Sequence, residues 1–231
     1  MIAAIRKRLA AHRGDAGFTL PEMLVVMGVF GLLMAITVGI LVQFLTLTRD
    51  SLARSQSLQE MRLGISQIDR QVRSGNLILD PQFEDPDNSG VPAFYSMRIL
   101  TQEDGVDKCV QWRVIDADGD GFGNLEFRRW DTGYTAGLVE PWSVVAHNVV
   151  DVGVDPSVNG IDSDDPATWP PFWVDPELGA YTEAQFVRIT LRLKEPLQSE
   201  DTKPASVTTV ITGRNTVFGY PSSSCQIVPD P

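Results

Sequence analysis

The sequence predicts an α+β protein in which one long N-terminal helix is followed by an antiparallel β-sheet domain. Residues 18–47 form an apolar run whose only formal charge is Glu22. A stripe of apolar residues at helical spacing continues from that run to residue 74. Beyond it, short segments of alternating apolar and polar residues are separated by turns rich in Gly, Pro and Asp. A helix that precedes a series of strands is the arrangement of an α+β fold.

The apolar run is long enough to cross a membrane, because about 20 apolar residues span the hydrocarbon core of a bilayer. It follows a leader, residues 1–17, whose basic residues are Arg6, Lys7, Arg8 and Arg13. Basic residues in front of a membrane helix hold that end in the cytoplasm and direct the following chain outward. We therefore expect a single-pass protein of the cytoplasmic membrane whose C-terminal domain is extracytoplasmic.

A secretory signal peptide is the alternative interpretation of this N-terminus. Such a peptide has an apolar region of about 7–15 residues, followed by a cleavage site of small residues. The run at residues 18–47 is longer, and the glycine at which a cut could occur, Gly17, precedes the run. We therefore expect the helix to remain on the mature protein.

The helix is predicted to continue through residues 48–75 as an amphipathic segment. Its apolar residues recur at spacings of three and four: Leu58, Met61, Ile65, Ile68 and Val72. A helix with one apolar stripe packs that stripe against a core and turns its polar faces to water. The sequence Ser74-Gly75-Asn76 then supplies a C-terminal stop, because glycine is favoured where a helix ends.

Residues 76–231 are expected to form a β-rich domain. The Pro-, Asp- and Gly-rich residues 80–92 predict an exposed loop. Strands are predicted at residues 94–100, 106–115, 124–130, 142–154, 185–194 and 206–212. In the strand at 185–194, we expect the core-facing residues to be Val187, Ile189, Leu191 and Leu193, and the outward-facing ones to be Arg188, Thr190, Arg192 and Lys194. The aromatic cluster at 169–173 is expected to pack in the core rather than form an exposed subunit contact.

The segment Gly17-Phe18-Thr19-Leu20-Pro21-Glu22 resembles the processing site of type IV prepilins and type II secretion pseudopilins. In that family a prepilin peptidase cuts after the glycine and methylates the new N-terminal amine, usually on a phenylalanine. The resemblance implies that the leader is removed after Gly17 and that Phe18 becomes the methylated N-terminus. It also implies a pilin-like fold. The layout of the later elements is more similar to the minor-pilin and J-type pseudopilin branch than to a major subunit.

The function that the resemblance implies is that of a minor pilin, a structural subunit of a type IV pilus-like filament. Its implied partners are the prepilin peptidase, other pilin or pseudopilin subunits, the cytoplasmic membrane and the assembly platform. A J-type pseudopilin of type II secretion is the alternative. The two differ in whether the fibre reaches the cell surface or acts as a short piston in the periplasm.

Glu22, the fifth residue counted from Phe18, has two interpretations. A carboxylate in the first turn of a helix interacts favourably with the positive end of the helix dipole. In a bundle of processed helices, however, the cationic amine of Phe18 and the Glu22 of a neighbour would also pair. A wrong axial register would leave both ions desolvated and unpaired, which is costly. The resemblance favours this second role, in which Glu22 sets the register of assembly.

The charge of the chain argues against a general nucleic-acid-binding surface. The whole chain has 19 basic and 30 acidic residues, a formal charge of −11. Removing the four basic residues and the single acid of the leader leaves 15 and 29, a charge of −14. Binding to nucleic acid of any sequence needs a basic surface, which this composition does not favour.

An acidic segment has the pattern with which calcium loops begin, namely alternating acids and a glycine in sixth place: Asp116, Asp118, Asp120 and Gly121. Phe122 would add a backbone carbonyl and Asn124 a side chain, but the twelfth position is Phe127 instead of a bidentate acid. A polar β-hairpin turn is the other interpretation, because Asp-Gly steps suit such turns. A bound calcium would favour a third function, a membrane-tethered calcium-dependent adhesin or binding module. We expect that no cofactor is required.

The two cysteines, Cys109 and Cys225, can form a disulfide if the domain is extracytoplasmic. We expect this pairing, which would fix the C-terminal tail to a central strand; two separate thiols are the alternative. We do not expect an enzyme. His147 is the only histidine after the leader, and the sequence has no nucleophile motif or phosphate-binding loop.

Overall fold

The computed structural model describes residues 17–84, 86–133, 139–150, 160–175, 186–196, 198, 201–213 and 223–230. Residues 1–16 of the predicted leader, residues 151–154 of one predicted strand and residue 185 of another lie outside these ranges. The chain divides into two compact units between Arg49 and Asp50.

The first unit consists of the N-terminal part of helix α2 (Leu20–Ser74). Its large apolar side chains are exposed, from Leu20 at 81% to Leu47 at 69%. A β-carbon added at Gly28, Gly31 or Gly39 would meet no atom within 4 Å. By length and composition α2 can cross a membrane, and it is the one helix among the described residues that can. The predicted long N-terminal helix is confirmed.

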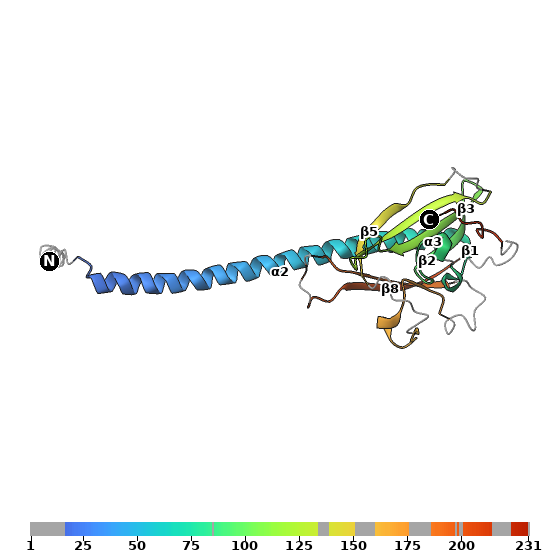
Figure 1. Cartoon of the computed structure of the whole chain (residues 1–231). Helices are drawn as coiled ribbons and strands as arrows, with labels where there is room; N and C mark the ends of the chain where they lie inside the picture. Colours follow the sequence, from blue (N-terminus) through green and yellow to red (C-terminus); the bar gives the residue numbers. More distant parts are fainter. Residues whose placement is uncertain are drawn as a thin grey trace, which may run out of the picture. The chain divides into compact units, whose positions relative to one another are not determined.

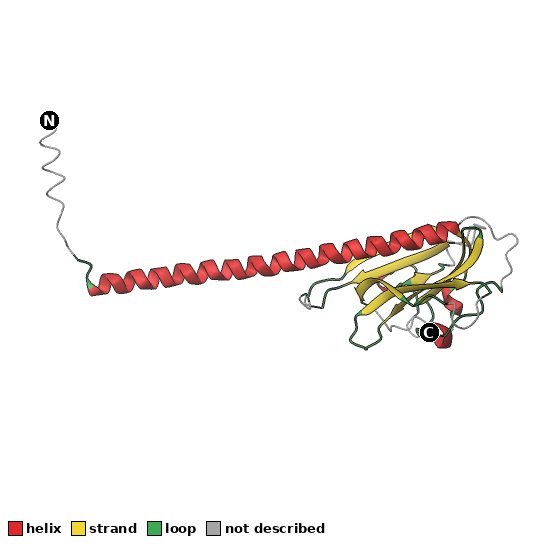
Figure 2. Cartoon of the chain, turned by 90° about the horizontal axis from the view of Figure 1, so that it is seen from above, coloured by secondary structure: helices red, strands yellow, loops and turns green. Residues whose placement is uncertain are grey.

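The second unit is an antiparallel sheet covered on one face by the C-terminal part of α2 (Figures 1 and 2). Its strands are β1 (Gly75–Ile78), β2 (Ser96–Glu103), β3 (Val106–Ile115), β4 (Gly123–Asp131), β5 (Ser143–Val149), β6 (Phe172–Trp173), β7 (Phe186–Leu193) and β8 (Ala205–Thr212). The order across the sheet is β1-β2-β3-β4-β5-β7-β6, and β8 pairs with β7. Within the described residues, three short helices lie in the connections: η1 (Pro81–Phe83), α3 (Pro86–Ser89) and η2 (Pro166–Thr168). The predicted α+β class is therefore confirmed.

Six of the eight described strands correspond to predicted strands. The two that were not predicted are very short, and one predicted strand ends early. β1 and β6 have four and two residues, too few for an alternation to be visible. β5 ends at Val149, next to Asn148 with φ +58°, so the described part of the predicted strand at 142–154 is shorter than expected. The predicted exposed loop at 80–92 contains η1 and α3 and buries Glu84 and Ser89.

The apolar stripe of α2 forms the core with one face of the sheet, as predicted. Met61, Ile68 and Val72 are fully buried, and each contributes on the order of 1.5–3 kcal/mol by leaving water. They belong to one cluster with sheet residues that include Met97, Ile99, Val110, Trp112 and Leu125. The Trp112 indole N–H donates to Gln71 Oε1 of α2 at 2.6 Å, which satisfies the polar atom of a fully buried ring.

The opposite face of the sheet is also buried, which the sequence analysis did not predict. In β3 the residues facing away from α2 are Cys109, Gln111 and Arg113, and all three are at most 8% exposed. In β7 the prediction that Arg188 and Thr190 face outward into solvent is wrong, because they are 8% and 3% exposed. Side chains and loops on this second face therefore form a second, more polar layer.

Candidate functional site

The N-terminal motif lies at the beginning of α2. The Thr19 carbonyl oxygen accepts from the amides of Glu22 at 3.0 Å and Met23 at 3.2 Å. The Thr19 hydroxyl lies 3.5 Å from Glu22 Oε2. Thr19 and Glu22 have the spacing of a capping box, a Ser or Thr followed three residues later by Glu or Gln. The sequence analysis did not identify this pair, although the spacing was visible in the motif.

Gly17 and Phe18 precede the helix and are exposed. Phe18 is 72% exposed, and a β-carbon added to Gly17 would meet nothing within 4 Å. The backbone of residues 17–19 is not part of α2, which begins at Leu20. The peptide bond between Gly17 and Phe18 is thus free of helical hydrogen bonds.

The acidic turn between β3 and β4 brings three carboxylates together. One oxygen from each of Asp116, Asp118 and Asp120 lies within 4.8 Å of the others. Asp116 accepts from the amide of Gly119 at 2.8 Å and from that of Gly121 at 2.9 Å. Burial acts to raise the pKa of Asp116, but these backbone hydrogen bonds outweigh it, so its pKa lies below the ordinary value. Asp120 likewise accepts from the Phe122 amide at 2.8 Å.

The remaining predicted calcium ligands are Phe122 and Asn124, and the side chain of Asn124 has another partner. The nearby Glu126 and Phe127, which are not predicted ligands, are also engaged. Asn124 Oδ1 lies 3.0 Å from His147 Nδ1. Glu126 forms a salt bridge with Arg113 at 3.0 Å, and Phe127 stacks on Trp112 with ring centroids 5.0 Å apart. Calcium takes six to eight oxygen ligands. The arrangement is that of a hydrogen-bonded hairpin turn, and calcium binding stays a prediction.

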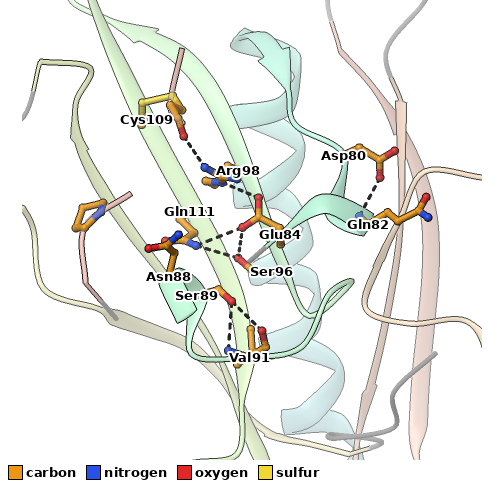
Figure 3. A network of polar contacts seen from close by, with 12 residues as sticks. Asp80, Gln82, Glu84, Asn88, Ser89, Val91, Ser96, Arg98, Cys109 and Gln111 are labelled. Carbon is orange, nitrogen blue, oxygen red and sulfur yellow. Dashed lines mark hydrogen bonds and ion pairs between the residues drawn. A yellow bond between two sulfur atoms is a disulfide. The ribbon is translucent and has the colours of Figure 1, made fainter. Parts of the chain in front are cut away.

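Glu84 is the centre of a buried polar network on the second face of the sheet (Figure 3). It is 4% exposed and accepts from Arg98 Nε at 2.6 Å and from the Ser96 hydroxyl at 3.0 Å. Gln111 donates to the same Ser96 hydroxyl oxygen at 3.0 Å. Arg98, Gln111 and Arg128 are neighbours in register across β2, β3 and β4. Sequence reasoning missed this network because its members are far apart in the chain.

A disulfide joins Cys109 in β3 to Cys225, with Cα atoms 5.6 Å apart. It fixes the C-terminal segment, residues 223–230, over the second face of the sheet. Arg98 Nη1 donates to the Cys225 carbonyl oxygen at 2.6 Å. Arg128 donates to the carbonyl oxygens of Pro229 at 2.8 Å and Asp230 at 2.6 Å.

In the aromatic cluster after η2, Phe172 belongs to the core formed with α2, whereas Trp169 and Trp173 lie against Arg188 on the second face. Arg188 forms a salt bridge with Asp175 at 2.9 Å and lies 3.9 Å from the ring centroid of Trp169 and 4.9 Å from that of Trp173. Phe172 is fully buried and Trp173 is 6% exposed, so the prediction of core packing is confirmed for these two residues.

A family model described as the prokaryotic N-terminal methylation motif matches residues 12–38. The matched residues include the glycine, phenylalanine and glutamate of the motif and the first part of α2, and none of the sheet. No curated protein and no solved structure matches the chain. The motif and the long apolar helix are consistent with the type IV pilin and pseudopilin family, and the role of proteins with this motif is structural.

Proposed function

We propose that this chain is a minor type IV pilin, a structural subunit that is anchored in the cytoplasmic membrane and polymerises through residues 18–47. The observation that carries the proposal is the methylation motif at the head of α2. The apolar side chains that follow the motif are exposed on every side of the helix. A helix that is apolar all round needs lipid or other apolar helices around it. Lipid surrounds the helix before assembly, and the helices of neighbouring subunits surround it in the filament.

Processing would occur between Gly17 and Phe18. Support comes from the exposure of both residues and from their place before the first helical turn. Cleavage there leaves an amine with a reference pKa near 8, which is mostly cationic at neutral pH, and N-methylation keeps that charge. The prepilin peptidase is the partner for this step.

Glu22 would then act at two stages. Within one subunit its carboxylate lies near the Thr19 hydroxyl and the positive end of α2. Within the assembled helix bundle it would pair with the Phe18 amine of a neighbour, and a subunit in the wrong axial register would bury both charges unpaired. The second stage explains why a carboxylate stands among apolar residues that would face lipid.

A J-type pseudopilin of type II secretion is the second candidate, because the same motif and helix serve that role. Deleting the gene would separate the two: loss of surface fibres supports the pilin, and retention of secreted enzymes in the periplasm supports the pseudopilin. In either role the chain is structural and not catalytic.

The experiment that tests the proposal is mass spectrometry of the N-terminal peptide from cells that contain prepilin peptidase. We expect the mature chain to begin at Phe18 with one added methyl group. Gly17→Leu should abolish processing, whereas Gly14→Leu in the same leader is the matched control and should leave it intact. A mature chain that begins beyond Leu47, or an uncut precursor that assembles equally well, would contradict the proposal.

A further inference from the structure

The C-terminal segment is held on the sheet by groups other than the two sulfur atoms. Arg98 donates to the carbonyl oxygen of Cys225 itself, and Arg128 donates to the carbonyl oxygens of residues 229 and 230. Val228 packs on the apolar cluster formed by Leu100, Cys109, Trp130 and Cys225. These contacts give the segment a docking site that does not require the disulfide.

The docking site for the Cys225 carbonyl is fixed by residues outside the segment. Arg98 is 8% exposed, and its Nε donates to Glu84 Oε1 at 2.6 Å. Glu84 accepts in turn from the Ser96 hydroxyl at 3.0 Å. Because these three residues belong to β2 and to the connection before it, the Arg98 guanidinium is already oriented when the segment docks. A charged donor that is oriented in advance forms one of the stronger hydrogen bonds in proteins.

The two cysteines differ in how an outside reagent can reach them. Cys109 is fully buried in β3, where its neighbours in register are Leu100 of β2 and Trp130 of β4. It is therefore enclosed by strands on both sides and by the docked segment above. Cys225 is itself only 5% exposed while the segment is docked, but it belongs to a short C-terminal segment in which Ile227 is 71% exposed. Release of the segment from its carbonyl contacts presents Cys225 to solvent, whereas Cys109 stays in the sheet. The rate of thiol–disulfide exchange depends on this access.

We propose that Cys225 is the residue that reacts first with an external disulfide oxidant, that Cys109 resolves the mixed disulfide, and that Arg98 is the positioning residue for the second step. In the first step the Cys225 thiolate attacks one sulfur of the oxidant. A Cys225–oxidant bond forms, the disulfide of the oxidant breaks, and its other sulfur leaves as a thiolate.

In the second step the segment docks through Arg98 and Arg128, which brings the mixed disulfide to Cys109. Cys109 loses its proton to solvent before the segment covers it. Its thiolate then attacks the Cys225 sulfur and releases the second sulfur of the oxidant as a thiolate. Two cysteine thiols are thereby oxidised, one disulfide is reduced to two thiols, and each cysteine has lost one proton. In the cell, this order of reaction depends on the proposed function in one respect: the domain must be exported to meet an oxidant. The experiment below adds the oxidant directly. A negative result would therefore count against the order of reaction and not against the proposed function.

The order of reaction is tested on the full chain, reduced and folded in detergent, with oxidised glutathione as the probe. After an acid quench, peptide mass spectrometry locates the glutathione. We expect the Cys109→Ser variant to accumulate glutathione on Cys225. In the Cys225→Ser variant, glutathione should add to Cys109 at least about tenfold more slowly than it adds to Cys225 in the first variant. Equal or faster reaction at Cys109 would overturn the proposal.

The role of Arg98 is tested with a charge-balanced pair of variants. We expect the double variant Glu84→Gln/Arg98→Gln to slow the second step about tenfold while the first step keeps its rate, because a hydrogen bond from a charged donor is lost. Glu140→Gln, which changes an exposed ion pair with Arg129 outside this network, is the control and should leave both steps at their original rates. Arg98→Lys should restore part of the second step. A merely structural role would lower the melting temperature without changing the ratio of the two rates, and that result would refute the positioning role.

Discussion

Gly75 and Ile99 approach so closely that a β-carbon on Gly75 would lie 2.7 Å from Ile99 Cγ2. Real side chains do not tolerate this distance, and the carbonyl oxygen of Gln71 would be only 3.0 Å away. The contact exists because β1 begins at Gly75, directly after α2 ends at Ser74. We predict that Gly75→Ala lowers the free energy of unfolding by about 1–3 kcal/mol through overpacking, measured by urea denaturation in detergent. Gly133→Ala is the control, since its β-carbon meets nothing within 4 Å; equal effects of the two would contradict the prediction.

The buried pair of Glu84 and Arg98 supports a second prediction. Glu84→Ala leaves the Arg98 cation buried without its carboxylate, and we expect a loss of about 3–5 kcal/mol in unfolding free energy. The double variant Glu84→Leu/Arg98→Met removes both charges and should lose less than Glu84→Ala. As a control, Glu140→Ala breaks an exposed pair with Arg129 and should change stability by about 1 kcal/mol or less. If the double variant is less stable than the single one, the account of this pair is wrong.

The acidic turn should respond to acid through Asp116. Burial opposes its ionisation, yet the amides of Gly121 and Gly119 hold the pKa of Asp116 below its ordinary value of 3.8. A lowered pKa in the folded state stabilises the fold above the ordinary value and loses that effect as the pH falls through the lower one. We therefore expect Asp116→Asn to lower the melting temperature at about pH 7 and to have a smaller effect at about pH 2. Asp201→Asn serves as an exposed control, and an Asp116→Asn effect that is the same at both pH values would be evidence against this role.

Calcium binding at the same turn can be tested separately. If the three converging carboxylates hold the ion, calcium should raise the melting temperature of the wild-type chain, because a ligand that binds the folded state stabilises it. Asp118→Asn should abolish that rise. Magnesium at the same concentration controls for general charge screening. Absence of any rise in the wild type would remove the calcium-dependent adhesin hypothesis.

Glu22 has two proposed roles, one at the start of its own helix beside Thr19 and one in setting the register of assembly. Variants of Glu22 and of Thr19 can separate these roles. We expect Glu22→Ala to insert and be processed normally but to enter filaments poorly, because the amine of its neighbour loses its partner. Thr19→Val removes the hydroxyl next to Glu22 and keeps the carboxylate, so it should assemble. Immunoblots of sheared filaments measure assembly, and immunoblots of membranes measure insertion and processing. Normal incorporation of Glu22→Ala would disprove the register role.

The elements that the sequence predicted well are those with a long periodic signal. The stripe through Met61, Ile68 and Val72 predicted both the second half of α2 and the face on which it packs. The expected pairing of Cys109 with Cys225 is the one that the structure contains. β1 and β6 could not be predicted, because strands of four and two residues have no measurable alternation.

The second face of the sheet shows where periodicity fails as a guide. Arg98 and Gln111 each lie between two apolar residues, a pattern that indicates solvent for one face of an antiparallel sheet. Arg128 is their neighbour in register on β4. In the folded protein these three residues are at most 8% exposed, because residues 81–84, 86–92 and 223–230 lie over them. Their partners are carbonyl oxygens and a carboxylate far away in the sequence. Charge alone could not predict burial that depends on such distant segments.

The direct joint between Ser74 and Gly75 also has a mechanical consequence. A tensile load applied along α2 enters the sheet through one peptide bond, with no linker to extend first. It arrives at β1, whose pairing with β2 is irregular between Gly75 and Leu77. Met61, Ile68 and Val72 carry part of the same load as shear against the sheet. The first structure to yield under tension would therefore be the four-residue edge strand, while the disulfide between β3 and the C-terminal segment lies off the line of force.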